Sequence, residues 1–285
     1  MFNNNKLILQ TGLLWFILFS GRLAAHEFWI EPLDYSPSIN DPIVANLKVG
    51  QDFKGNALAF MTVEFEDFEI VLANNINNNS NNNSKNIPTE VSTRFGDIPA
   101  LNQANLGAGL TILSYVSGNS TVVYPSYEKF TEFLDKEGLN WVIEEHRKRQ
   151  LPAFGFTEAY QRFCKSLVAV ENAQGNDYAL GLRFEWVLNN NPYSNNPAEP
   201  NINAQLLWEG KPFANSRAIV FTHHKGTVAH SFYTTDDQGY IRIKRQDNTA
   251  YMISAVHMIQ PGLALAGSTG AVWQSLWSST TFKIP

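Results

Sequence analysis

The chain has 285 residues, of which 44% are hydrophobic and 13% aromatic, and its formal net charge at pH 7 is −5. Nucleic acids and anionic membrane surfaces are held by clusters of basic side chains, so this acidic balance excludes both as predicted partners. Cys164 is the only cysteine, which excludes an internal disulfide, and stability must come from a packed core.

The first 25 residues have the layout of a secretory signal peptide. Lys6 gives the N-terminal region a positive charge, an apolar run follows from Leu7 to Phe19, and small residues precede the predicted cleavage site after Ala25. The run is shorter than the roughly 20 residues that cross a bilayer. We therefore predict cleavage between Ala25 and His26 and a periplasmic or secreted protein. An uncleaved N-terminal anchor is the alternative.

Residues 26–125 predict an N-terminal β-domain. Apolar residues alternate or run over strand lengths, with Gly, Pro and Asn between them, at 28–30, 42–50, 59–65, 91–95, 111–116 and 120–124. The stretch from Asn74 to Asn86 is almost entirely Asn and Ser. Because it has no apolar face to bury, it predicts a disordered surface insert.

Residues 126–175 predict a helical insert. Apolar residues recur at three- and four-residue spacing from Tyr127 until Gly138, and a second short helix is expected from Trp141 to Arg149. A third helix is expected to begin at Thr157, which is a suitable N-cap. It would place five apolar side chains on one face: Tyr160, Phe163, Cys164, Leu167 and Val168.

Residues 176–285 predict a C-terminal β-sandwich of immunoglobulin-like type. Short strands separated by polar turns recur roughly every ten residues, at 180–188, 202–208, 216–223, 231–235, 240–244, 250–257 and 279–284. No alternation of strands with crossover helices is visible here. The whole chain is therefore expected to be mainly β, with no helix longer than about two turns beyond residue 200.

Several motifs resemble one family of exported bacterial proteins of unknown function. They are His26-x-Phe28-Trp29-Ile30-Glu31-Pro32, Val49-Gly50-Gln51-Asp52-Phe53-Lys54-Gly55, Asn191-Pro192-Tyr193, Glu209-Gly210-Lys211-Pro212, Ala255-Val256-His257-Met258 and Trp273 to Phe282. That family is commonly grouped with periplasmic accessory components of nickel and cobalt uptake. The resemblance implies a transthyretin-like C-terminal sandwich, a membrane transporter component as partner, and a recurring histidine pair that falls on His26 and His257.

His26 is the leading candidate metal ligand because cleavage before it would free its α-amine. The amine and the imidazole together form a bidentate chelate that suits Cu(II) or Ni(II). One residue supplies only two donors, so His257 is predicted to complete the site. A secondary site is considered at His223, His224 and His230, although adjacent strand residues point to opposite faces.

His146 lies in the charged run from Glu144 to Arg149 and is interpreted as part of a solvated helix face. The chain carries no His-Glu-x-x-His, Gly-x-Ser-x-Gly or phosphate-binding glycine motif. We therefore predict a non-enzymatic protein that binds nickel, cobalt or copper or assists its importer. The alternative is a periplasmic or surface module that binds a carbohydrate or a protein, suggested by Trp273, Trp277 and Phe282.

Overall fold

The computed structural model describes residues 26–73, 88–194 and 199–285, and it confirms the predicted mainly β fold. The predicted signal peptide and the Asn-rich insert lie outside these residues. The N-terminal strands are β1 (Glu27–Pro32), β2 (Ile43–Gln51), β3 (Lys54–Leu58), β4 (Phe65–Ala73), β5 (Thr89–Glu90), β6 (Leu101–Gln103), β7 (Gly109–Ser117) and β8 (Ser120–Tyr124).

Two helices separate these strands from the rest of the chain. They are α1 (Tyr127–Glu137) and α2 (Trp141–Lys148). The strands that follow are β9 (Phe156–Val170), β10 (Phe184–Leu188), β11 (Asn201–Trp208), β12 (Lys211–Pro212), β13 (Arg217–His224), β14 (Thr227–Thr234), β15 (Tyr240–Lys244), β16 (Thr249–Ile259) and β17 (Ala271–Ile284). The short helix α3 (Leu263–Thr269) connects β16 to β17, which confirms the prediction that helices beyond residue 200 are short.

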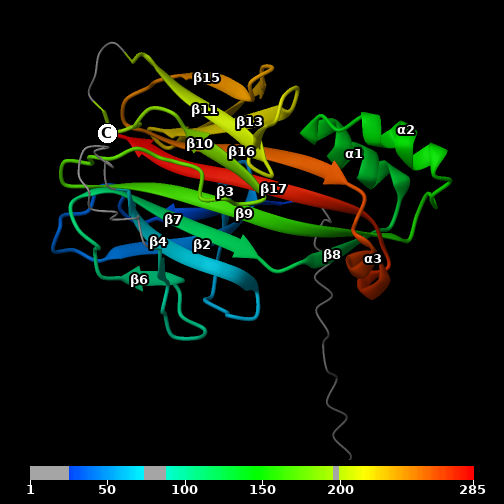
Figure 1. Ribbon diagram of the computed structural model, residues 1–285, viewed down its shortest axis with the longest axis horizontal. Coiled ribbons are helices and arrows are strands. Elements are labelled where there is room, and N and C mark those ends of the chain that lie inside the picture. Colours follow the sequence, from blue (N-terminus) through cyan, green and yellow to red (C-terminus); the bar gives the residue numbers. More distant parts are fainter. Residues whose placement is uncertain (1–25, 74–87, 195–198) are drawn as a thin grey trace, which may run out of the picture.

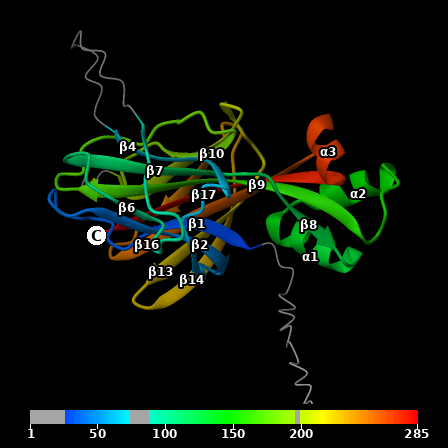
Figure 2. The same cartoon turned by 90° about the horizontal axis from the view of Figure 1, so that it is seen from below.

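The strands form three stacked sheets (Figures 1 and 2). The middle sheet has the order β14-β13-β16-β17-β9-β7-β4-β5, with β8 paired to β9. One of its faces is covered by β1, β2, β3 and β6, and the other by β10, β11, β12 and β15. Alternation along β9 shows both interfaces: Leu167 packs toward β10 and β11, whereas Val168 packs toward β1 and β2.

The prediction of a third helix from Thr157 is wrong, because residues 156–170 form the long strand β9. This strand pairs with β7 and β8 in antiparallel fashion and with β17 in parallel. Since β9 is buried on both faces, apolar residues occur on both sides of the strand and the period of two disappears from the sequence. The apolar residues then also satisfy helical spacing, and periodicity alone could not separate the two structures.

The predicted helices over residues 126–149 are confirmed and their ends have clear causes. Ser126 is the N-cap of α1 and accepts a hydrogen bond from Lys129 N, and Gly138 ends the helix in the left-handed conformation with φ of 73°. Figures 1 and 2 show α1, α2 and α3 at the same end of the molecule. No helix in the described part of the chain is long and apolar enough to cross a bilayer.

Strand β1 is attached to the middle sheet through side-chain hydroxyls of β17. Ser279 Oγ donates to Phe28 O at 2.7 Å and Thr281 Oγ1 donates to Ile30 O at 2.6 Å. Trp29 is fully buried and packs against Phe53 and against Met252 of β16. The N-terminal strand is therefore fixed by hydrogen bonds and by a large apolar side chain.

A buried ion-pair cluster lies between the middle sheet and the β10–β11 sheet. Lys165 Nζ of β9 is 2.6 Å from Asp177 Oδ1 and 3.8 Å from Glu185 Oε2, and all three side chains are at most 1% exposed. The same ammonium donates to the carbonyl oxygens of Tyr178 and Trp186, both at 3.1 Å. Each group in this cluster has a partner, as burial of charge requires.

Candidate ligand-binding site

His257 of β16 lies in an aromatic environment between the middle sheet and the β10–β11 sheet. Its ring centroid is 4.5 Å from those of Trp208 and Phe213 and 6.0 Å from that of Phe184. Burial lowers the pKa of His257 to about 4, and the nearby Arg183 acts in the same direction. The imidazole is therefore neutral at neutral pH, and its buried Nε2 has no hydrogen-bond partner in the described structure.

A pocket of about 270 Å³ opens beside His257. Strand β13 pairs with β16 only as far as Ala218 and Ala255, so the edge of β16 is open at Val256 and His257. The walls come from the segment between α1 and α2 and from the segment between β12 and β13. We call this cavity the His257 pocket; it is lined by Gly138, Leu139, Trp141, Phe213, Ala214, Asn215, Ser216, Arg217, Val256 and His257.

Arg217 fixes one wall of the His257 pocket to the end of α1. Its guanidinium donates to Asp135 O and Lys136 O, two carbonyls in the last turn of the helix. Gly138 allows this close approach, since a Cβ there would lie 2.8 Å from the Arg217 side chain. Arg217 is the one charged residue among the described residues that line the pocket, and its charge is engaged by the helix end.

Two aromatic side chains of the His257 pocket are partly exposed. Trp141 at the start of α2 is 51% exposed and packs edge-on against the buried Trp273 at 6.4 Å. Phe213 is half-buried and lies edge-on to Trp208 at 5.7 Å. Asn215 and Ser216 follow Phe213 and add polar groups to the lining. An open cavity with aromatic walls and few polar groups has the form of a small-molecule site.

The structure places His26 and His257 on different sides of the middle sheet. His26 is half-buried and directly precedes β1, which packs on the face that carries Met252 and Val256. The ring of His257 lies on the opposite face, among the aromatic residues near β11. Next to His26, the buried Glu27 pairs with Lys136 of α1. Across the described ranges, no three His, Cys, Asp or Glu side chains are grouped to hold a metal ion.

The other three candidate histidines lie on the hairpin of β13 and β14. His223 pairs with Val228 and His230 with Phe221, so His223 and His230 are diagonal neighbours on one face, and both are exposed. His224 points to the other face, where its Nδ1 lies 2.9 Å from Thr249 Oγ1. The structure thus brings together His223 and His230, and it separates His224 from them.

The interpretation of His146 as solvated is wrong, since only 2% of the residue is exposed. Its Nδ1 accepts a hydrogen bond from Trp273 Nε1 at 3.0 Å, and its Nε2 lies 3.0 Å from Pro152 O. Burial lowers the pKa of His146. The charged neighbours in sequence face solvent, but His146 itself occupies the inner face of α2 and joins the core beneath the helices.

The aromatic residues that suggested a sugar site are mostly buried. Trp273 is 1% exposed, Trp277 7% and Phe282 0%, so all three are core residues. In the His257 pocket the ring of Trp141 is exposed and that of Phe213 is half-buried, and neither was singled out from the sequence. The sequence signal that could have identified Trp141 is a tryptophan next to a run of charged residues.

Cys164 is also buried, as expected, and burial raises the pKa of its thiol to about 12.

The fold and the cavity define a mainly β protein of three stacked sheets with a ligand-sized pocket at an open sheet edge. The chain belongs to the family described as a domain of unknown function (DUF4198), which matches residues 23–259. The match runs from the start of β1 to the end of β16 and so includes every wall of the His257 pocket. No curated protein matches the sequence. The match supports the predicted resemblance to a family of unknown function, whereas the quoted motifs, export and the grouping with nickel and cobalt uptake stay predictions.

Proposed function

We propose that this is an exported, non-enzymatic protein that binds a neutral carbohydrate in the His257 pocket. The observation that carries the proposal is an open cavity in which two partly exposed aromatic rings lie beside a neutral histidine, whose buried Nε2 has no hydrogen-bond partner among the described residues. A sugar ring has an apolar face that stacks on an aromatic side chain and hydroxyl groups that hydrogen-bond at its rim. Trp141 and Phe213 supply the rings, and His257 with Asn215 supplies polar groups.

Charge and size support a small neutral ligand. Among the residues that the structure describes, the pocket lining contains no acid. Its Arg217 is engaged by helix carbonyls, and His257 is uncharged at neutral pH. A volume of about 270 Å³ is near the lower end of the roughly 300–1,000 Å³ typical of small-molecule sites. One or two sugar rings fit this size.

Replacing Trp141 by alanine is expected to weaken sugar binding by about tenfold or more, because the exposed stacking surface is lost. Titration calorimetry with glucose, galactose, mannose, N-acetylglucosamine and their disaccharides measures this. Phe154→Ala is the matched control, since Phe154 is 72% exposed and does not line the pocket. If none of these sugars binds, or if Trp141→Ala binds as tightly as the unmodified protein, the proposal is wrong.

A second candidate function is binding of Ni(II), Co(II) or Cu(II). The observation that favours it is that His223 and His230 are exposed diagonal neighbours on one face of the β13–β14 hairpin. Two imidazoles offer nitrogen donors that suit these ions, and water would fill the remaining coordination positions of the metal. His26 remains a proposed ligand of its own, through its α-amine, if the chain is cleaved after Ala25.

Metal titration by calorimetry on protein that begins at His26 separates these ligands. His230→Ala is expected to weaken Ni(II) binding by about tenfold if the hairpin is the site, whereas His224→Ala is the control on the other face. One extra residue before His26 should weaken binding only if the amine is a ligand. Affinity through the amine should rise with pH, since it must lose a proton to bind. If all these variants bind the metal as tightly as the unmodified protein, the metal proposal is wrong.

A further inference from the structure

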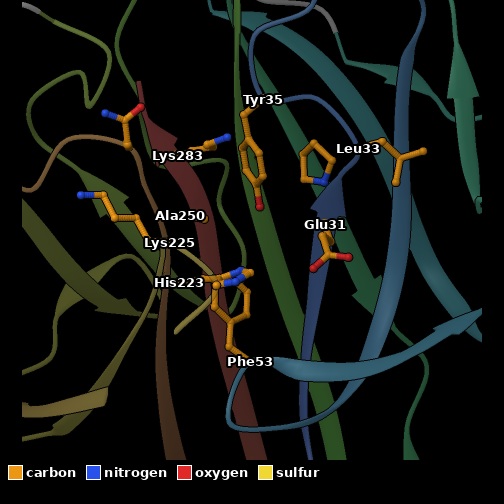
Figure 3. A pocket seen from close by; sticks show the side chains of 11 residues that line it. Glu31, Leu33, Tyr35, Phe53, His223, Lys225, Ala250 and Lys283 are labelled. Atoms are coloured by element: carbon orange, nitrogen blue, oxygen red, sulfur yellow. The ribbon is translucent and has the colours of Figure 1, made fainter. Parts of the chain in front are cut away.

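A second cavity, of about 380 Å³, lies at the opposite end of β1 from His26. We call it the Tyr35 pocket. Its lining comes from the end of β1 and the residues after it, from the β13–β14 hairpin, from the turn before β16, and from β17 (Figure 3). His223, Ala250 and Lys283 lie side by side across β13, β16 and β17, which forms one wall. Strands far apart in the sequence therefore build this pocket together.

Two lysines give the Tyr35 pocket a positive charge in a chain whose net charge is −5. Lys225 is at the turn of the hairpin, and Lys283 is an exposed residue in the otherwise buried end of β17. Neither forms an ion pair with another residue in the described part of the chain. The one acid in the lining, Glu31, is already paired with Lys48 at 3.1 Å. The uncompensated charge in the pocket is therefore cationic.

Tyr35 adds a hydrogen-bond donor inside the pocket. The residue is only 8% exposed, and its hydroxyl lies near that of Thr281 without a hydrogen bond of good geometry to any described residue. The neighbouring Thr281 uses its own hydroxyl on Ile30 O and Ser166 Oγ. Burial raises the pKa of Tyr35, so the hydroxyl keeps its proton. Figure 3 shows the hydroxyl directed toward the middle of the pocket, with Lys283 beside the Tyr35 ring.

An unpaired buried hydroxyl is costly unless a ligand completes its hydrogen bonding. A donor and two ammonium groups select an anion, and hydrogen bonds to charged groups are the stronger ones. Phe53, Pro32 and Ala250 add apolar surface to a lining that also contains His223 and Asn248. The apolar surface suits the carbon skeleton of an organic acid better than a bare inorganic ion. We propose that the Tyr35 pocket binds the carboxylate of a small organic acid, with Tyr35, Lys225 and Lys283 contacting the carboxylate and Phe53 contacting its apolar part.

This proposal concerns a site separate from the His257 pocket and does not depend on sugar binding. Phenylacetate is a suitable probe because it joins a carboxylate to an apolar ring, and its neutral amide, phenylacetamide, is the ligand control. Binding is measured by calorimetry and by chemical-shift changes of the amides around the pocket. We expect phenylacetate to bind, phenylacetamide to bind at least about tenfold more weakly, and inorganic phosphate to bind more weakly than phenylacetate.

Variants identify the contacts without disturbing the fold. Tyr35→Phe removes only the hydroxyl, and Lys283→Met removes a charge at an exposed position; each is expected to raise the dissociation constant of phenylacetate by about tenfold. Lys244→Met is the matched control, since Lys244 is an exposed strand lysine outside the pocket lining. Absence of phenylacetate binding, equal binding of the amide, unchanged binding by both pocket variants, or tighter binding of phosphate would each overturn the proposal.

Discussion

Replacing Lys165 by methionine is expected to lower the free energy of unfolding by about 3–5 kcal/mol. The change leaves the carboxylates of Asp177 and Glu185 buried without the cation that lies between them. Their remaining hydrogen bonds come from backbone amides, such as that from Leu188 N to Asp177 Oδ2 at 2.8 Å. These amides cannot replace a full positive charge in a buried site.

Urea unfolding followed by tryptophan fluorescence measures this loss. Lys211→Met is the control, because Lys211 is an exposed residue of the short strand β12 and its replacement should change stability by less than about 0.5 kcal/mol. A second comparison replaces all three charged residues by Met, Asn and Gln together, which should recover part of the loss because no charge is then left unpaired. A loss below about 1 kcal/mol for Lys165→Met would show that water reaches the cluster.

The stability of the protein is expected to fall as pH rises from about 4.5 to about 7 because of Glu158. This carboxyl is fully buried, and burial raises its pKa from 4.5 to about 7, although hydrogen bonds from Ser275 and Tyr124 oppose the shift. Between these two pH values the folded protein keeps the proton and the unfolded chain releases it. The stabilisation is therefore complete below the unfolded pKa and is lost as pH rises through the folded pKa. The change amounts to about 3 kcal/mol.

Glu158→Gln tests this dependence because glutamine resembles the protonated acid. Unfolding in urea at pH 5 and at pH 7.5 should show a smaller difference in the variant than in the unmodified protein. Asp237→Asn, at an exposed turn carboxylate, should leave the difference unchanged. Glu137 has a pKa raised to about 7 by burial as well, so some pH dependence should persist in the variant. If Glu158→Gln keeps the full difference, Glu158 does not cause it.

Strands and helices could be predicted from the sequence where only one face of the element is buried. Strand β2 alternates because its second face is exposed or half-exposed, and α1 shows helical spacing because its outer face is solvated. The sequence of strand β9 does not alternate in this way, because both faces of the strand are covered. The same reasoning explains His146, whose charged neighbours suggested a solvated position while its own side of the helix faces the core.

The pockets could not be predicted in the same way. His257 was singled out, but its neighbours Trp141 and Phe213 come from separate connecting segments, and no local pattern shows that they meet. Tyr35 and Lys283 meet only because β1 lies on the strand that contains Lys283. Sequence periodicity indicates which face of a strand is buried, whereas the meeting of distant loops depends on strand order and on where pairing stops. That information was absent from a single sequence.

The position of β17 has a consequence for how the chain reaches its native state. This strand lies between β16 and β9 in the middle sheet, and it also holds β1 through its hydroxyls. Contacts such as that between Ser166 and Thr281 join residues 115 positions apart. Contacts of such long range make folding slow, because a large loop must close before they contribute. Until β17 inserts, β9 and β16 lack a neighbour and expose strand edges, so the half-folded chain is the form most open to aggregation, to proteases and to chaperones.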